Sequence, residues 1–199
     1  MAFRAGNENP LYCCRKGVCI MFDKNVVFTG KHAEYLRALA QGSGKPEPNH
    51  DWAFKMNYQV LMAAPVIGFL YERFSPKDND KNIQENKIFV EQLINNIDQL
   101  ELIYRTIVLL AQSDSVSLDE RMNRAFRYDR DEEKRRKGDE IFKGYVRAGI
   151  EVLYEQLIQG AETKSDDIQK LQDFVVLCGQ FEHEDDPECI YKFCREAGI

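Results

Sequence analysis

Apolar residues recur at helical spacing along most of this 199-residue chain. In residues 83–112 they step by four, four, three, four, three and four positions, which predicts one apolar stripe on a continuous helix. The stripe consists of Phe89, Leu93, Ile97, Leu100, Tyr104, Ile107 and Ala111. At 1.5 Å per residue this helix would be about 45 Å long, and Asn95–Asn96 is the expected break if it divides in two.

Other segments carry helical patterns of different kinds. Residues 54–74 are apolar nearly all round, as expected of a helix in the centre of a bundle. Pro65 should kink this helix, and Gly68 would allow a neighbour to approach closely. Residues 131–159 form a second long amphipathic helix. The remaining predicted helices span residues 30–41, 118–128, 166–179 and 187–196.

Residues that favour helix N-caps support these bounds. Ser117 and Glu120 have the spacing of a capping box. The other expected N-caps are Thr29, Ser165 and Asp186. Alternation typical of a strand occurs only in residues 24–29, which are too few to define a sheet. The prediction is an all-α fold: a single compact bundle of about seven or eight helices, two of them long and amphipathic.

The N-terminal segment differs from the rest. Residues 1–20 fit no periodic pattern, and Met21 follows them directly. They are expected to be a disordered N-terminal extension or an over-long choice of start site, which leaves residues 21–199 as a single all-helical domain. The most apolar stretch, residues 58–71, is shorter than the roughly 20 residues of a membrane span. With no secretory signal and no dense cysteine framework, a reduced, cytoplasmic protein without membrane association is predicted.

Two loops resemble phosphate or calcium motifs but lack essential residues. "GSGK" at 42–45 has Leu39 at the first glycine position of a phosphate-binding loop and Pro46 at its Ser/Thr position. "DNDKN" at 78–82 lacks the glycine and the bidentate glutamate of a calcium loop. The first loop is therefore not expected to bind nucleotides, and the second is expected to be a solvated turn.

Metal and cofactor chemistry has weak support. A zinc site would have to use Cys178, His183, Cys189 and Cys194. Cys189 and Cys194 are five residues apart, so on a helix they would point about 140° apart, and the usual close ligand pair is missing. No metal and no cofactor are expected, and these four residues stay a weak alternative.

Catalytic motifs are also missing from the sequence. The three histidines, His32, His50 and His183, lie in different local contexts, and none belongs to a nucleophile motif. An enzyme would need a composite site assembled from scattered residues, for which the surroundings of His32 are the place to look. The sequence leans towards a protein without catalysis of its own.

The most conspicuous segment sets an arginine at every third position, at Arg121, Arg124, Arg127 and Arg130. Between residues 119 and 140, eight acidic side chains balance eight basic ones, and i,i+4 pairs such as Glu120 with Arg124 are available. A self-paired, solvated helix surface is the favoured interpretation. A charged face that binds another protein is the second interpretation. A phosphate-binding face is disfavoured because the interleaved acids would repel the phosphate groups. The candidate contact residues are Arg121, Arg124, Arg127, Tyr128 and Arg130, whereas Phe126 is expected in the core.

The net charge of −6 is unlike that of a general nucleic-acid-binding protein. We expect an accessory or scaffold subunit that acts by protein–protein interaction in a larger bacterial assembly, such as a defence or DNA-processing complex. The alternatives are a nucleic-acid-associated module that uses the surface of residues 121–137, and an enzyme with a composite site. Another protein subunit is the expected partner, nucleic acid is disfavoured, and a homo-oligomer stays open.

Overall fold

The computed structural model describes residues 22–41, 53–112, 115–129 and 131–181. Within them the chain forms seven α-helices and one two-stranded sheet, which confirms the all-α prediction. The α-helices are α1 (Lys31–Leu39), α2 (Asn57–Leu70), α3 (Val90–Ile94), α4 (Ile97–Leu110), α5 (Leu118–Met122), α6 (Glu132–Leu157) and α7 (Lys164–Cys178). A π-helical turn, η2 (Asn123–Arg127), continues α5, and a short 3₁₀ turn, η3 (Gly179–Phe181), follows α7.

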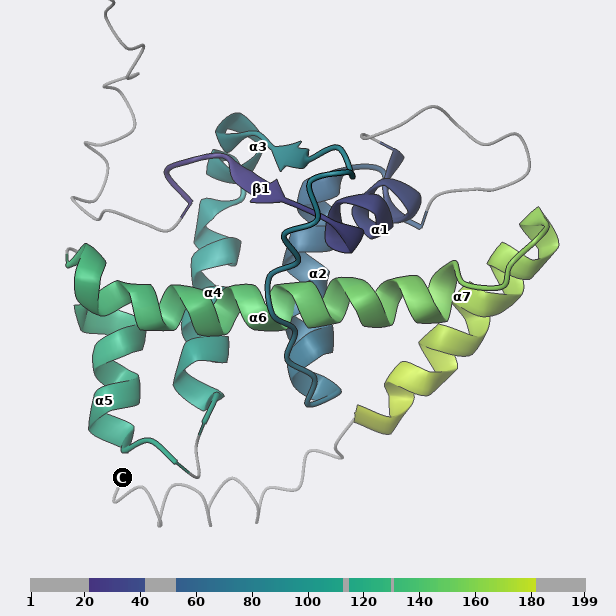
Figure 1. Ribbon diagram of the computed structural model, residues 1–199. Coiled ribbons are helices and arrows are strands. Elements are labelled where there is room, and N and C mark those ends of the chain that lie inside the picture. Colours follow the sequence, from purple (N-terminus) through teal and green to yellow (C-terminus); the bar gives the residue numbers. More distant parts are fainter. Residues whose placement is uncertain (1–21, 42–52, 113–114, 130, 182–199) are drawn as a thin grey trace, which may run out of the picture.

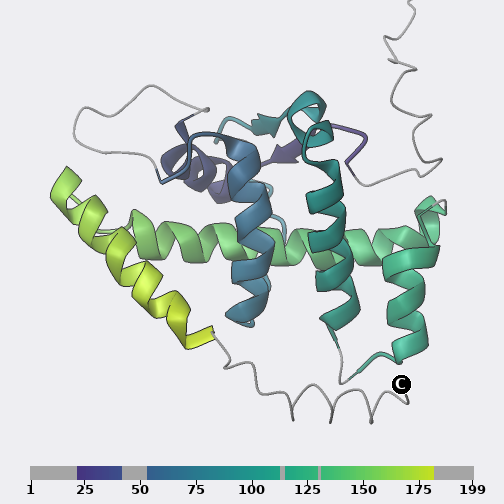
Figure 2. The same ribbon diagram turned by 180° about the vertical axis from the view of Figure 1, so that it is seen from behind.

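The 26-residue helix α6 is the element around which the others are arranged. In Figure 1 it runs across the molecule, α2 and α4 cross it, and α5 lies beside α4 near one end of it. Figure 2 shows the same arrangement from behind, with α5 near one end of α6 and α7 near the other. Buried side chains of α1, α2, α4 and α6 form one apolar core, and Tyr35 of α1 stacks on Tyr154 of α6 at 3.9 Å between ring centroids.

Two glycines allow α2 and α6 to approach within backbone contact. A Cβ atom on Gly149 would lie 1.7 Å from the carbonyl oxygen of Ala64, and one on Gly68 would lie 2.2 Å from that of Tyr145. Side chains at these positions would separate the helices, so the prediction of a close neighbour at Gly68 is confirmed. Pro65 lies inside α2, which continues through it as one helix.

Residues 83–112 do not form the single long helix that the apolar stripe predicted. They contain strand β2 (Asn86–Ile88), then α3, then α4, and the helix does break at Asn95–Asn96. Strand β2 pairs antiparallel with β1 (Val26–Phe28), so the segment judged too short for a sheet does form one. Phe89, the first residue of the predicted stripe, is exposed and is the N-cap of α3. The buried stripe therefore begins only at Leu93.

The N-terminus of α1 is capped by a residue from a distant loop. Asp78 accepts a hydrogen bond from the backbone N–H of Lys31 at 2.8 Å, and this bond lowers the pKa of the Asp78 carboxyl. The N-cap position belongs to Gly30, with φ 58°, whereas Thr29 donates its hydroxyl to the backbone carbonyl of Asp78. The prediction of Thr29 as N-cap was wrong, and the loop at 78–82 does more than fill a solvated turn.

The other described caps follow local chemistry. Ser117 accepts from the backbone N–H of Glu120, as predicted, and Asp131 caps α6 in the same way. Thr163, not Ser165, caps α7 and forms a capping box with Asp166, so α7 begins earlier than expected. The predicted extension at 1–20 and the predicted helix at 187–196 with its Asp186 cap lie outside the described residues. In the described part of the chain, no helix is both long enough and apolar enough to cross a membrane.

Candidate functional site

Two arginines of the 121–130 run bind acceptors on or beside α4. An Nη atom of Arg121 donates to the carbonyl oxygen of Leu109 at 2.7 Å, which satisfies a carbonyl at the C-terminal end of α4. Arg124 is buried and donates to Oε1 of Glu120 at 2.9 Å and to the side chain of Gln112 at 3.2 Å. Both guanidinium groups therefore attach α5 and η2 to α4.

The remaining residues of the run have different surroundings. Arg127 is exposed and donates to Oδ1 of Asn123 at 2.8 Å, while the hydroxyl of Tyr128 donates to Glu120 at 3.2 Å. Arg130 lies outside the described residues. The ion pair of Glu120 with Arg124 forms as predicted. Contact of these arginines with a partner or with phosphate stays a prediction.

The weak zinc alternative involves only one described residue. Cys178 lies at the end of α7, where burial raises the pKa of its thiol. His183, Cys189 and Cys194 fall outside the described residues. Among the residues that the structure does place, no three His, Cys, Asp or Glu side chains are gathered as a metal site would require.

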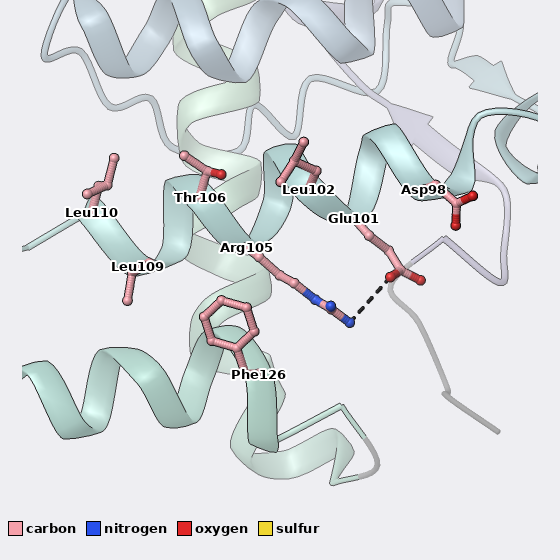
Figure 3. A pocket seen from close by; sticks show the side chains of 8 residues that line it. All are labelled: Asp98, Glu101, Leu102, Arg105, Thr106, Leu109, Leu110 and Phe126. Atoms are coloured by element: carbon pink, nitrogen blue, oxygen red, sulfur yellow. Dashed lines mark ion pairs between the residues drawn. The ribbon is translucent and has the colours of Figure 1, made fainter. Parts of the chain in front are cut away.

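An apolar groove lies between α4 and η2, and we call it the α4–η2 groove. It has a volume of about 470 Å³. Figure 3 shows Phe126 of η2 on the side of α4 that carries Leu109 and Arg105, whereas Leu102 and Leu110 project from the other side of α4. The exposed fractions are 67% for Leu102, 46% for Leu110 and 45% for Phe126. The prediction that Phe126 lies in the core was therefore wrong.

Charged side chains border one end of the α4–η2 groove. Arg105 lies 5.7 Å from the ring centroid of Phe126 and pairs with Glu101 at 3.3 Å and with Asp129 at 3.4 Å. Asp98 is exposed one turn of α4 before Leu102. Three carboxylates against one guanidinium leave this end of the groove negative. In the sequence, the signal for the groove was the set of apolar residues on α4 that lie off its buried stripe, such as Leu102 and Leu110.

A second polar cluster surrounds Glu151, which is buried in the middle of α6. Its Oε1 atom lies 2.8 Å from Nε2 of His32, 2.9 Å from Nζ of Lys31 and 2.5 Å from Oγ of Ser75. Arg73 lies 3.6 Å from the other carboxylate oxygen. The cluster thereby joins α6 to α1 and to the segment after α2. Its signal in the sequence was an acid between Ile150 and Val152, in the most apolar part of its helix.

The order of these hydrogen bonds decides what the cluster can do chemically. In a nucleophilic triad the histidine stands between the serine and the acid. Here Glu151 stands between them, since His32 and Ser75 both donate to the same carboxylate oxygen. His32 also borders a cleft beside α6, so polar groups do converge near it. The geometry places Ser75 and His32 as supports of a buried carboxylate.

Burial sets the protonation state of His32, which is only 1% exposed. Burial lowers its pKa below the ordinary 6.5, and the hydrogen bond to Glu151 opposes this only in part. The neutral ring therefore donates through Nε2, because a carboxylate can only accept. Burial by itself would raise the pKa of Glu151, but hydrogen bonds from Ser75, Lys31 and His32 outweigh it and lower that pKa.

We expect folding stability to fall as the pH drops below 6.5, because the unfolded chain binds a proton on His32 at a pH where the folded chain does not. The lowered pKa of Glu151 adds a further loss below pH 4.5. Urea unfolding at a series of pH values measures both. In His32→Gln, which keeps an N–H donor, the loss just below pH 6.5 should disappear. If His50→Gln flattens the profile instead, the assignment to His32 is wrong.

Comparisons of the chain with known proteins identified no relative. Matches were sought among protein-family models, curated proteins and solved structures, and none was found in any of the three. The α4–η2 groove and the polar residues around α6 are therefore the observations from which a function can be inferred.

Proposed function

We propose that this protein is a non-catalytic accessory subunit that binds an amphipathic helix of another protein in the α4–η2 groove. The observation that supports this proposal is the exposed apolar wall of the groove, which is formed by Leu102, Leu110 and Phe126. An apolar patch with charged residues at its border is typical of protein–protein interaction sites. We place this binding in the cytoplasm, within a larger assembly.

The two sides of α4 show why the wall is available to a partner. Leu100, Ile107 and Val108 are buried in the core, so α4 already has a complete inward face. Leu102 and Leu110 lie off that face and contribute apolar area that stays in water. Covering such area releases about 25 cal/mol per Å². A partner that fills the groove would gain this free energy without disturbing the core.

The dimensions and the charge of the groove indicate the chemistry of its occupant. From Asp98 to Leu110 it follows α4 for thirteen residues, or about 18 Å, which matches roughly three turns of helix. A helix laid in such a groove would present apolar anchors at i, i+3 or i+4, and i+7. A lysine or arginine at one end of this helix would meet Asp98 and Glu101, which border the groove.

The nucleic-acid alternative receives less support from the same region. Phosphate binding would need guanidinium groups that are available to a ligand. Arg121 and Arg124 already donate to Leu109, Glu120 and Gln112. Arg127 is the exposed member of the run among its described residues. These contacts favour the protein-binding proposal.

The proposal predicts that Leu102→Lys weakens the complex by at least about thirtyfold, the effect of losing one energetically dominant interface residue. The free energy of unfolding should change by less than about 1 kcal/mol, because Leu102 is exposed and lysine favours a helix. The partner is first isolated with the wild-type chain from its native cells and purified. Affinities are then measured with purified proteins, and hydrogen exchange locates the protected segment.

Val176→Lys on α7 provides the matched control. Val176 is 79% exposed, and α7 lies at the opposite end of α6 from α5. We expect this variant to bind as the wild type does, with residues 98–110 and 123–127 protected in the complex. Loss of binding in Val176→Lys with full binding in Leu102→Lys would place the interface on α7 and overturn the proposal.

A further inference from the structure

A cleft of about 370 Å³ lies between residues 22–29 and α6, on a different surface from the α4–η2 groove. Its inner wall includes Phe28, Phe142 and His32, all of which are buried. Pockets of this size and lining are typical of small-molecule sites. The residues on its border determine which class of molecule fits.

Positive side chains gather on this cleft. Lys24, Lys77, Lys143 and Arg147 all line it. Within the described residues, none of these four has a carboxylate at ion-pair distance, although the chain as a whole carries −6. On α6, Lys134 and Arg135 by contrast each pair with an acid. The cleft is therefore a cationic site on an acidic protein.

Three of these cations lie close together. Lys143 and Arg147 are four residues apart on α6, which places them on the same face of the helix. The Nε atom of Arg147 donates to the backbone carbonyl of Ser75 at 2.8 Å, two residues before Lys77 in the chain. This bond brings the segment that carries Lys77 against α6.

Such an arrangement has an energetic cost in the empty protein. Like charges at i,i+4 repel each other, and half-buried Arg147 has lost part of its hydration, a cost that the nearby charge of Glu151 offsets only in part. Burial accordingly lowers the pKa of Arg147, although a guanidinium stays charged at neutral pH. A bound anion would add negative charge beside these cations.

We propose that the cleft binds the phosphate group of a small molecule through Lys77, Lys143 and Arg147. Two ammonium groups and one guanidinium fork match a doubly charged phosphate better than a single carboxylate. The apolar wall with Phe28 and Phe142 would receive the uncharged part of the ligand. This inference is independent of the partner helix proposed for the α4–η2 groove.

The acids in the same cleft favour a small ligand over a nucleic acid. Asp23, Glu132 and Asp139 line it along with the cations. Glu132 and Asp139 lie one to four turns before Lys143 and Arg147 on α6, so a long polyanion that follows the helix would meet negative charge. A single phosphate group can occupy the cationic end without approaching them.

Isothermal titration calorimetry of the full chain tests the proposal at constant ionic strength. The probes are AMP, inorganic pyrophosphate, the dicarboxylate malonate and a single-stranded DNA oligonucleotide. We expect AMP and pyrophosphate to bind at one site per chain, and malonate and the oligonucleotide to bind more weakly. Lys77→Gln and Lys143→Gln should each weaken AMP binding by about tenfold, the effect of losing one charge-assisted hydrogen bond.

Lys137→Gln is the matched control, because Lys137 is an exposed lysine of α6 that does not line the cleft. It should bind AMP as the wild type does. Both lysine variants change exposed residues and should fold normally, so the result does not depend on Arg147→Gln, which loses its bond to Ser75. The proposal is overturned if neither AMP nor pyrophosphate binds, if all three lysine variants bind AMP equally, or if malonate or the oligonucleotide binds more tightly than AMP.

Discussion

Replacing Glu151 with alanine is expected to lower the free energy of unfolding by about 3–5 kcal/mol, the usual effect of removing one member of a buried charged network. The carboxylate accepts from His32, Lys31 and Ser75, and all three lose their acceptor in the variant. His32 and Ser75 are themselves buried, so water does not readily replace it. Urea unfolding followed by circular dichroism measures the change.

Glu155→Ala is the control for this variant. Glu155 lies one turn further along α6 and pairs with Arg73 through both carboxylate oxygens, at 2.5 and 2.9 Å. Because both side chains are more than a third exposed, this pair should contribute less than about 1 kcal/mol. If Glu151→Ala lowers stability no more than Glu155→Ala does, the cluster around Glu151 does not support the fold.

Introducing one methyl group at Gly149 is expected to be at least as damaging, with a loss of about 3 kcal/mol or more. The new Cβ atom of Gly149→Ala would lie 1.7 Å from the carbonyl oxygen of Ala64, a backbone atom that cannot rotate away. Relief requires α2 and α6 to separate, which opens the centre of the core. The higher helix propensity of alanine, worth about 1 kcal/mol, does not compensate. Thermal and urea unfolding of purified protein measure the loss.

Gly179→Ala makes the same chemical change where no steric conflict exists. No neighbouring atom lies within 4 Å of a Cβ atom built at Gly179, and its φ of −59° suits any residue. This variant should differ from the wild type by less than about 1 kcal/mol. Equal stability of the two alanine variants would mean that α2 and α6 do not touch through Gly149.

The break within residues 83–112 shows that a local pattern can identify the buried face of a helix correctly and still extend that helix over residues that form a strand. From Leu93 to Ile107 the apolar stripe correctly identifies the positions of α3 and α4 that pack in or against the core. Before Leu93 the helical spacing continues by coincidence, because Asn86–Ile88 pair with Val26–Phe28. Backbone pairing with a segment 60 residues away overrides a local helical preference.

Candidate sites were harder to predict than helices, because they depend on which side of a helix is covered. Arg121 and Arg124 stood out as a charged run, yet both donate to acceptors on or beside α4. Phe126 was expected in the core, yet it is exposed in the α4–η2 groove together with Leu102, which lies off the predicted stripe. Local spacing identifies an apolar residue, but only a neighbouring element decides whether water reaches it.

The sequence by itself determined the all-α class, the positions of α1, α2, α6 and α7 to within a few residues, and the close approach at Gly68. These depend on spacing, caps and residue size within one segment. Only the tertiary structure decided that His32 meets Glu151 across 119 residues, that Asp78 caps α1, and that Lys77 joins Lys143 and Arg147. Such contacts unite segments whose local patterns are independent of one another, so their chemistry exists only once the core has brought the helices together.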